Sequence, residues 1–271
     1  MVATLEVVAA AIYAGAALVY GASLAEGRRV ASWAGSVLIL LAVFLHAAAV
    51  AGYVTAFGEL PLVGLAPSLS TFALLLGLTA LGASALEETR PIALVLLPII
   101  VVLQTVAAVL GVEPAGEAMT FRGAWFGLHV LLAFVGYAGL SVAFAAGLLY
   151  LLQFRELKVK RFGRMFRFFP SLETLDRLGR WSLMVGFPAL TLGLVIGWGW
   201  AARFDQEYGP GNPKVLWGVI TWLVFVAALT SRLTGSRRDR RGAMVSVVGF
   251  VFVIVTYVVL RLLMPDGRFF L

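Results

Sequence analysis

Long apolar stretches separated by short polar turns dominate the chain from end to end. A helix that crosses a bilayer needs roughly 20 mostly apolar residues. Eight stretches reach this length, and they lie near residues 3–24, 30–53, 67–85, 91–111, 121–153, 181–202, 214–231 and 242–263. The runs are continuously apolar rather than alternating, which excludes a membrane β-barrel. We therefore expect an all-α, polytopic transmembrane helical bundle of about eight spans.

The region between the fifth and sixth stretches is more polar. Residues 148–169 keep a helical register while they become basic, which predicts that the fifth helix projects beyond the membrane until Pro170 ends it. Ser171, Glu173 and Asp176 then favour the start of another helix, because a hydroxyl cap and early acids suit the positive end of a helix. No linker separates a second domain, so we expect one domain over residues 1–271.

The composition supports a membrane protein. The chain is 61% hydrophobic and 13% charged, whereas soluble domains are nearer half apolar. It has no cysteine, which rules out disulfides, thiolate metal sites and thioether attachment of haem to this chain. The first apolar stretch lacks a basic leader and carries Glu6 near its start, so we expect a retained helix rather than a cleaved signal peptide.

The basic residues are distributed unevenly between alternate loops. If the N-terminus lies outside, sixteen of the twenty-one fall in inner loops and five, namely Arg122, Arg203, Lys214, Arg261 and Arg268, fall outside. Cytoplasmic loops carry the excess of Lys and Arg, so both termini are predicted to lie outside the cytoplasm. This pattern places the protein in the cytoplasmic membrane and attributes its charge of +7 to topology and lipid contact, not to nucleic acid.

A Trp-rich segment over residues 197–222 separates the sixth and seventh apolar stretches. Its Trp and Tyr side chains favour the membrane interface, and Gly209, Pro210, Gly211 and Pro213 prevent a continuous helix. On these grounds alone the segment is an aromatic belt in a loop, which the topology places on the outer side.

The order of residues in this segment resembles the tryptophan-rich loop of the cytochrome c assembly family, the CcsA and CcmC-type membrane proteins that handle haem. The matching positions are Gly197, Trp200, Ala201, Tyr208, Pro213, Lys214, Trp217, Ile220, Thr221, Trp222 and Leu223. The loop departs from the family pattern where Asp205, Gly209 and Gly211 replace tryptophans, Asn212 replaces an aspartate and Val215 a glutamate. These departures make the chain most similar to the HemX-like and YpjD-like branch of eight-span proteins.

The chain has two histidines, and both lie inside predicted spans. His129, in GLHVLLAFVGYA, matches the family histidine that precedes the tryptophan-rich loop, and His46, in FLHAAAV, resembles a second-span histidine of the HemX-like branch. At 1.5 Å per residue, both are expected about 10–12 Å below the outer surface. The resemblance implies that they coordinate haem b as axial ligands. The alternative is two buried histidines bonded to backbone or hydroxyl groups.

Other residues are expected to complete such a site. Gln104 lies at the same depth and is a candidate for a hydrogen bond to a ligand or for helix packing. Trp125 and Tyr53 are candidates to wall a porphyrin, and Trp200, Tyr208 and Trp217 are the aromatic loop positions that the resemblance assigns to haem. Arg122, Arg203 and Lys214 could pair with haem propionates or anchor the loop at the interface.

These observations predict a non-enzymatic haem-binding or haem-handling protein that supports assembly of c-type cytochromes. The expected partners are haem, other cytochrome c assembly proteins, apocytochrome c and the lipid bilayer. One alternative is a HemX-like protein that regulates haem synthesis. Another is a small-solute transporter, against which we count the expected lack of a buried carboxylate and of paired broken helices.

Overall fold

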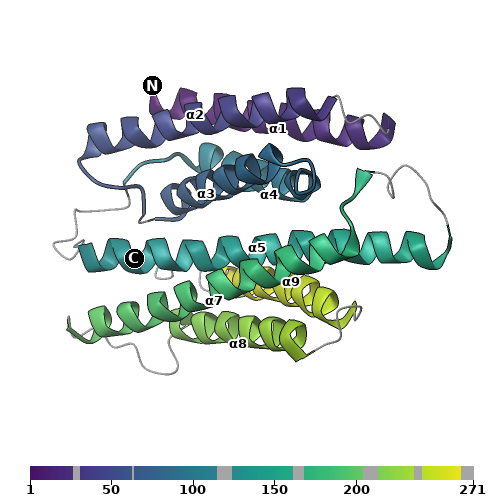
Figure 1. The fold of residues 1–271 in the computed structure, drawn as a ribbon. Helices are drawn as coiled ribbons and strands as arrows, with labels where there is room; N and C mark the ends of the chain where they lie inside the picture. The colour runs from purple at the N-terminus through teal and green to yellow at the C-terminus, as the bar shows by residue number, and fades with distance from the viewer. Residues whose placement is uncertain are drawn as a thin grey trace. The chain divides into compact units, whose positions relative to one another are not determined.

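The computed structural model describes residues 1–26, 31–62, 64–114, 124–160, 168–203, 213–234 and 240–263. Over these residues the chain is helical, with no strand, and Figure 1 shows the helices as long coiled ribbons. All eight are long and apolar enough to cross a membrane, which confirms the predicted spans. The helices are α1 (Val2–Glu26), α2 (Ala31–Phe57), α3 (Leu65–Ala85), α4 (Pro91–Leu110), α5 (Ala124–Lys158), α7 (Leu172–Arg203), α8 (Pro213–Thr234) and α9 (Arg240–Leu263).

The polar region after the fifth span differs from the prediction. Helix α5 ends at Lys158 rather than near Pro170, and Lys160 has a φ of 55°. This left-handed backbone conformation cannot continue a right-handed helix, so the prediction of an uninterrupted projection was wrong. The predicted cap is confirmed, because the backbone N–H of Thr174 donates to Ser171 Oγ at 3.2 Å.

The described residues form two compact units. Unit 1 contains α1 to α4, together with α5 from Leu152 and α7 up to Thr174. Within it, α1 packs against α2 and α4, and α3 packs against the same two helices. The four helices therefore form a closed bundle, whose members carry the labels α1 to α4 in Figure 1.

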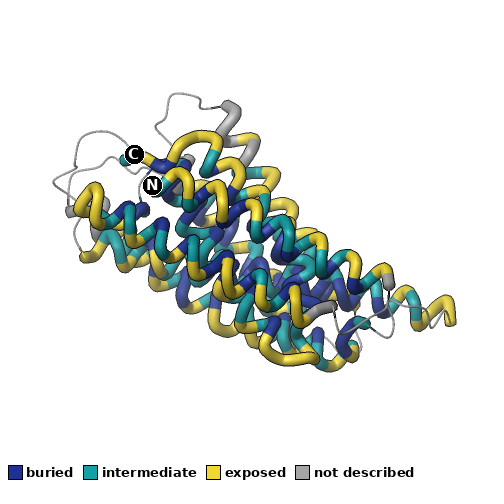
Figure 2. The backbone as a smooth tube through the Cα atoms, turned by 90° about the horizontal axis from the view of Figure 1, so that it is seen from above, coloured by how far each residue is buried: buried dark blue, intermediate teal, exposed yellow. Residues whose placement is uncertain are grey.

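Unit 2 contains α5 up to Leu151, α7 from Leu175, α8 and α9. Its apolar core takes buried side chains from all four helices, namely Leu140, Ala143, Leu183, Leu190, Phe225, Ala228 and Val253. Burial alternates along each helix in Figure 2, where dark blue buried positions run beside yellow exposed ones. The exposed positions include large apolar side chains such as Trp198, which suits helices that face lipid.

Glycines bring α5 and α7 close together within unit 2. A Cβ atom on Gly139 would lie 2.6 Å from the carbonyl oxygen of Ser182, and one on Gly136 would lie 2.8 Å from the Cβ of Leu190. Further along the same contact between α5 and α7, Gly193 faces Ala133 and Leu132. Small residues at helical spacing allow this backbone approach. The close contact between the two helices extends to His129 of α5, which lies beside Gly193 and Gly197 of α7.

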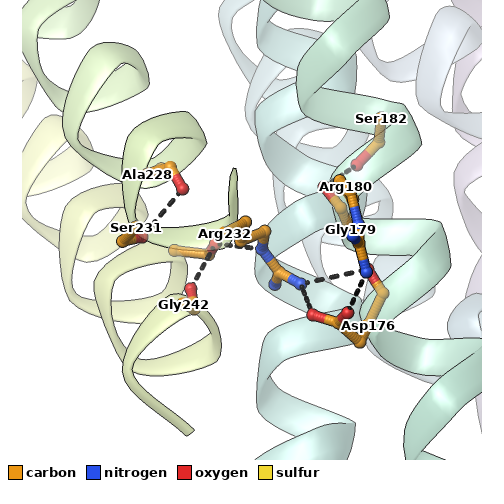
Figure 3. A network of polar contacts seen from close by, with 9 residues as sticks. Asp176, Gly179, Arg180, Ser182, Ala228, Ser231, Arg232 and Gly242 are labelled. Atoms are coloured by element: carbon orange, nitrogen blue, oxygen red, sulfur yellow. Dashed lines mark hydrogen bonds and ion pairs between the residues drawn. The ribbon is translucent and has the colours of Figure 1, made fainter. Parts of the chain in front are cut away.

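A polar network joins three helices of unit 2 (Figure 3). The side chain of Arg232, near the end of α8, is 1% exposed, and its Nη1 donates to Asp176 Oδ1 at 3.2 Å. The Nε of Arg232 donates to Ser246 Oγ in α9 at 3.1 Å. Arg180 pairs with the same aspartate from one turn further along α7. The buried arginine thereby connects α7, α8 and α9.

Candidate functional site

His129 lies in the second turn of α5 and is half-buried against α7. Its Nδ1 is 2.7 Å from the backbone carbonyl oxygen of Gly193. A carbonyl oxygen only accepts hydrogen bonds, so Nδ1 carries the proton and donates it. The neutral ring then has its lone pair on Nε2, for which the described residues provide no hydrogen-bond partner. This arrangement leaves one nitrogen available to an external ligand.

Aromatic side chains accompany His129 on the same part of α5. Trp125, one turn earlier, is 66% exposed. The ring of Phe126 lies with its centroid 6.4 Å from that of the imidazole. The exposed ring of Trp125 is compatible with a flat apolar group beside His129, and its role as a wall for a porphyrin stays a prediction.

His46 has a different environment, in the interior of unit 1. It is 0% exposed, and its Nε2 lies 3.0 Å from Ser70 Oγ in α3 and 3.8 Å from Glu6 Oε2 in α1. Ser70 Oγ also donates to both carboxylate oxygens of Glu6, at 3.0 and 3.1 Å. A hydroxyl has a single proton, so His46 Nε2 must be the donor to Ser70. The lone pair of His46 is therefore on Nδ1, which is buried and has no hydrogen-bond partner among the described residues.

Glu6 and Ser70 are the two residues of this network that the sequence interpretation did not include in the site. Glu6 is the charged member of the pair. It is 1% exposed, so the expectation that the chain has no buried carboxylate was wrong. The sequence analysis used Glu6 only as an argument against a cleaved signal peptide, but its side chain lies between the helices of the bundle. The signal that could have identified it is a lone acid within an apolar span, because such residues usually face the bundle interior.

Gln104 belongs to the same network, in which it joins α4 to α1, and this contact fits the helix-packing alternative given for it above. Its Nε2 donates to Glu6 Oε2 in a short contact, and no described contact joins it to either histidine. Each of α1, α2, α3 and α4 thus contributes one buried polar side chain to this network, namely Glu6, His46, Ser70 and Gln104. Glu6 and Ser70 link Gln104 to His46 in this network, and the common depth of Gln104 and His46 in the membrane stays a prediction.

Tyr53, a predicted wall of the haem site, packs inside unit 1. Tyr53 is 1% exposed and contacts Ala66, Ala107 and Val112, so it lies in the apolar core of unit 1. Its hydroxyl is 3.5 Å from Glu59 Oε1. The fold therefore uses Tyr53 for packing, whereas Trp125 remains at the surface.

Trp217 in α8 lies between aromatic rings of two other helices. The centroid of its ring is 5.2 Å from that of Tyr137 in α5 and 5.4 Å from that of Tyr257 in α9. Its indole N–H donates to the carbonyl oxygen of Val253 at 3.4 Å. These contacts hold Trp217 in the packing of unit 2.

The remaining loop positions fall partly outside the described residues. Trp200 is helical near the end of α7, Arg203 ends that helix, and Lys214 is helical near the start of α8. Their side chains are not among those described. Tyr208 and Arg122 lie outside the described residues altogether. The structure also describes His46 and His129 in separate units, so their shared coordination of one haem stays a prediction.

Comparison with known proteins gives a consistent result. Residues 10–265 match the family of cytochrome C assembly proteins. The cytochrome c biogenesis protein CcsA of Guillardia theta is 34% identical over 148 residues, which are 49% of this chain and 49% of that protein. The CcsA of Synechococcus sp. (strain CC9605) is 34% identical over 163 residues, covering 52% of this chain and 54% of the relative. The chain spans about half the length of these relatives.

The fold is also found in a solved structure. The cytochrome c heme lyase CcmF has a TM-score of 0.66 with 18% sequence identity, and the match covers 98% of this chain and 49% of that one. At this identity the likeness concerns the fold. These relatives carry the name CcsA, and the HemX-like branch stays a prediction. Because the family match extends over most of its length, the chain belongs to the cytochrome c assembly protein family.

Proposed function

We propose that this protein handles haem in a cytoplasmic membrane and supports the biogenesis of c-type cytochromes, with His129 as an axial ligand of haem b. The observation that carries the proposal is the orientation of the His129 ring. Its Nδ1 is bonded to the Gly193 carbonyl, and its Nε2 keeps a lone pair that no described residue engages. Histidines that bind metals usually donate their other ring N–H to such a fixed acceptor.

The surroundings of His129 fit a porphyrin. Trp125 is exposed one turn earlier on α5, where a flat apolar ring could stack on it. A bound haem supplies an iron that accepts the nitrogen lone pair of a neutral imidazole. The residues of this chain provide the ligand atom, its orientation and an apolar wall.

His46 stays the predicted second ligand, and the two histidines are not equivalent. The Nε2 of His46 donates to Ser70, and its lone pair is on the buried Nδ1. Coordination by His46 therefore requires haem to enter unit 1 or the Ser70 hydrogen bond to break. The order of importance that follows is His129 first and His46 second.

The predicted partners come from the relatives. The proteins named CcsA are cytochrome c biogenesis proteins, which supports haem, apocytochrome c and other assembly proteins as partners and favours this function over the regulatory and transporter alternatives. The name of CcmF, a heme lyase, raises the question of catalysis. We assign no catalytic residue, and a role without catalysis remains our prediction.

The test is the haem content of purified variants. We expect His129→Ala to lower the haem-to-protein ratio by about tenfold or more and to change the absorption spectrum, because the iron loses its protein ligand. Leu128→Ala is the matched control, since this adjacent side chain is apolar, 42% exposed and offers no ligand atom to iron. His46→Ala, measured separately, reports whether the second histidine coordinates.

Trp217→Ala provides a comparison within the tryptophan-rich segment. Its ring packs between Tyr137 and Tyr257, so we expect it to cost less haem than His129→Ala in equally folded protein. Full haem occupancy in His129→Ala, with the spectrum of the unmodified protein, would contradict the proposed ligand.

A further inference from the structure

The imidazole of His129 occupies the space that a side chain would fill on Gly197. A Cβ atom at residue 197 would lie 2.5 Å from both Cε1 and Nδ1 of the ring and 3.2 Å from Cγ. Carbon and nitrogen atoms in packed proteins do not approach this closely without a bond. A methyl group at position 197 and the present position of the imidazole therefore exclude each other.

Gly193 lies one turn before Gly197 on the same face of α7. Its carbonyl oxygen accepts the His129 Nδ1–H at 2.7 Å, and its Cα is close to the backbone of α5, since a Cβ there would lie 3.2 Å from the nitrogen of Ala133. The opposite face of α7 carries Val195 and Trp198, which are 64% and 74% exposed. The glycines thus form the side of α7 that receives the imidazole.

We infer that Gly193 and Gly197 form a seat for His129, that is, the surface of α7 against which the imidazole rests. Gly197 is a positioning residue, because it determines which of the two ring nitrogens is available as a ligand. Gly197 leaves room for the ring to lie flat against α7, where Nδ1 reaches the Gly193 carbonyl. With Nδ1 protonated, the lone pair is on Nε2. The inference rests on the proposed function only where it assigns Nε2 as a ligand of the haem iron.

The seat explains a feature of the sequence that hydropathy does not. Gly197 begins the segment that resembles the tryptophan-rich loop, yet a glycine disfavours the helix in which it lies. Alanine would favour that helix, so a loss caused by Gly197→Ala would arise from the contact with His129. The substitution therefore isolates the packing of the ring from the stability of α7.

A haem-free experiment tests the seat directly. With two histidines in the chain, nitrogen NMR of the ¹⁵N-histidine-labelled protein gives two imidazole patterns, which His129→Gln assigns. In the haem-free protein at mildly alkaline pH, we expect His129 to carry its proton on Nδ1. His46 should show the opposite tautomer, with the proton on Nε2.

Gly197→Ala should remove the single tautomer of His129 and produce a mixture or the Nε2–H form. Gly199→Ala is the matched control, because a Cβ at residue 199, in the same helix, would meet no heavy atom of the described residues within 4 Å. It should leave the His129 pattern unchanged. An unaltered His129 tautomer in folded Gly197→Ala would overturn the inference. If that variant does not fold, the tautomer measured in the unmodified protein is the test. A His129 ring that is protonated on Nε2, or that exchanges freely between tautomers, also overturns the inference.

A second measurement separates this inference from the proposed function. In haem-loaded protein, Gly197→Ala should weaken haem binding by about 10- to 100-fold, the usual effect of losing the partner that orients a metal ligand, and should shift the reduction potential. Gly199→Ala should do neither. An unmodified protein that shows the Nδ1–H tautomer and binds no haem would retain the seat and refute the haem function. Conversely, the haem function would be retained and the seat refuted if His129 binds haem while Gly197→Ala changes neither the tautomer nor the affinity.

Discussion

Ser70 connects the acid and the imidazole of unit 1. Its hydroxyl donates to Glu6 and accepts from His46, and all three residues are at most 1% exposed. We expect Ser70→Ala to lower the free energy of unfolding by about 1–3 kcal/mol, because it leaves buried polar groups without their partner while hardly changing the volume of the side chain. Denaturant or thermal unfolding of the purified protein in detergent measures the loss.

Thr79→Ala is the control for this prediction. Thr79 is on the same helix, and its hydroxyl donates to the carbonyl oxygen of Leu75 one turn earlier, within α3. Losing that hydroxyl removes no contact between helices, so its effect should be smaller. Equal losses from both variants would show that the Ser70 network contributes little to the stability of the bundle.

At the scale of helices, Asp176 holds the start of α7 to the end of α8. The guanidinium of Arg232 is almost completely buried and shares this carboxylate with Arg180. We expect Asp176→Asn to lower the free energy of unfolding by about 3–5 kcal/mol, because removing one member of a buried pair leaves the other charge uncompensated. Chemical unfolding, together with limited proteolysis near α7, would measure the effect.

The matched control is Glu173→Gln, which removes an acid from an exposed position in the first turn of the same helix. Exposed acids near a helix start contribute roughly 0.3–1 kcal/mol through the helix dipole. A loss from Asp176→Asn no larger than this would mean that Arg232 is stabilised by its other contacts, among them Ser246.

At the scale of the whole molecule, the distribution of basic residues predicts the orientation in the membrane. The sixteen-to-five division between alternate loops favours an inner location for the loop between α8 and α9, and an outer location for the loop between α7 and α8. Reporter fusions at Gly235 and Gly211 should therefore report the cytoplasm and the opposite side, respectively. Fusions at the two glycines that report the same side would refute this orientation.

The eight helices could be predicted from the sequence because the bilayer imposes one strong condition. Backbone groups in lipid must be hydrogen-bonded within the segment, so each crossing needs a long, uninterrupted apolar helix that hydropathy detects. The end of α5 was not detectable in the same way. The helical register of residues 148–169 continued, and the left-handed turn at Lys160 interrupted the helix.

The sequence also determined the family and both histidines, because the order of residues around His129 and in the tryptophan-rich segment is local. It did not determine the partners of these histidines. His46 meets Ser70 and Glu6 from two other helices, and His129 meets the Gly193 carbonyl, 64 residues away. Such contacts depend on the rotation and register of packed helices.

The spans could be predicted but the partners of the histidines could not, because lipid surrounds the helices in place of water. A helix in lipid is apolar on the face that contacts lipid as well as on the face that contacts its neighbours, so periodicity does not distinguish them. Both histidines read alike in the sequence, as lone polar residues in apolar spans. Tertiary packing gave them opposite tautomers, with Glu6 and Ser70 engaging one ring and a pair of glycines in α7 receiving the other.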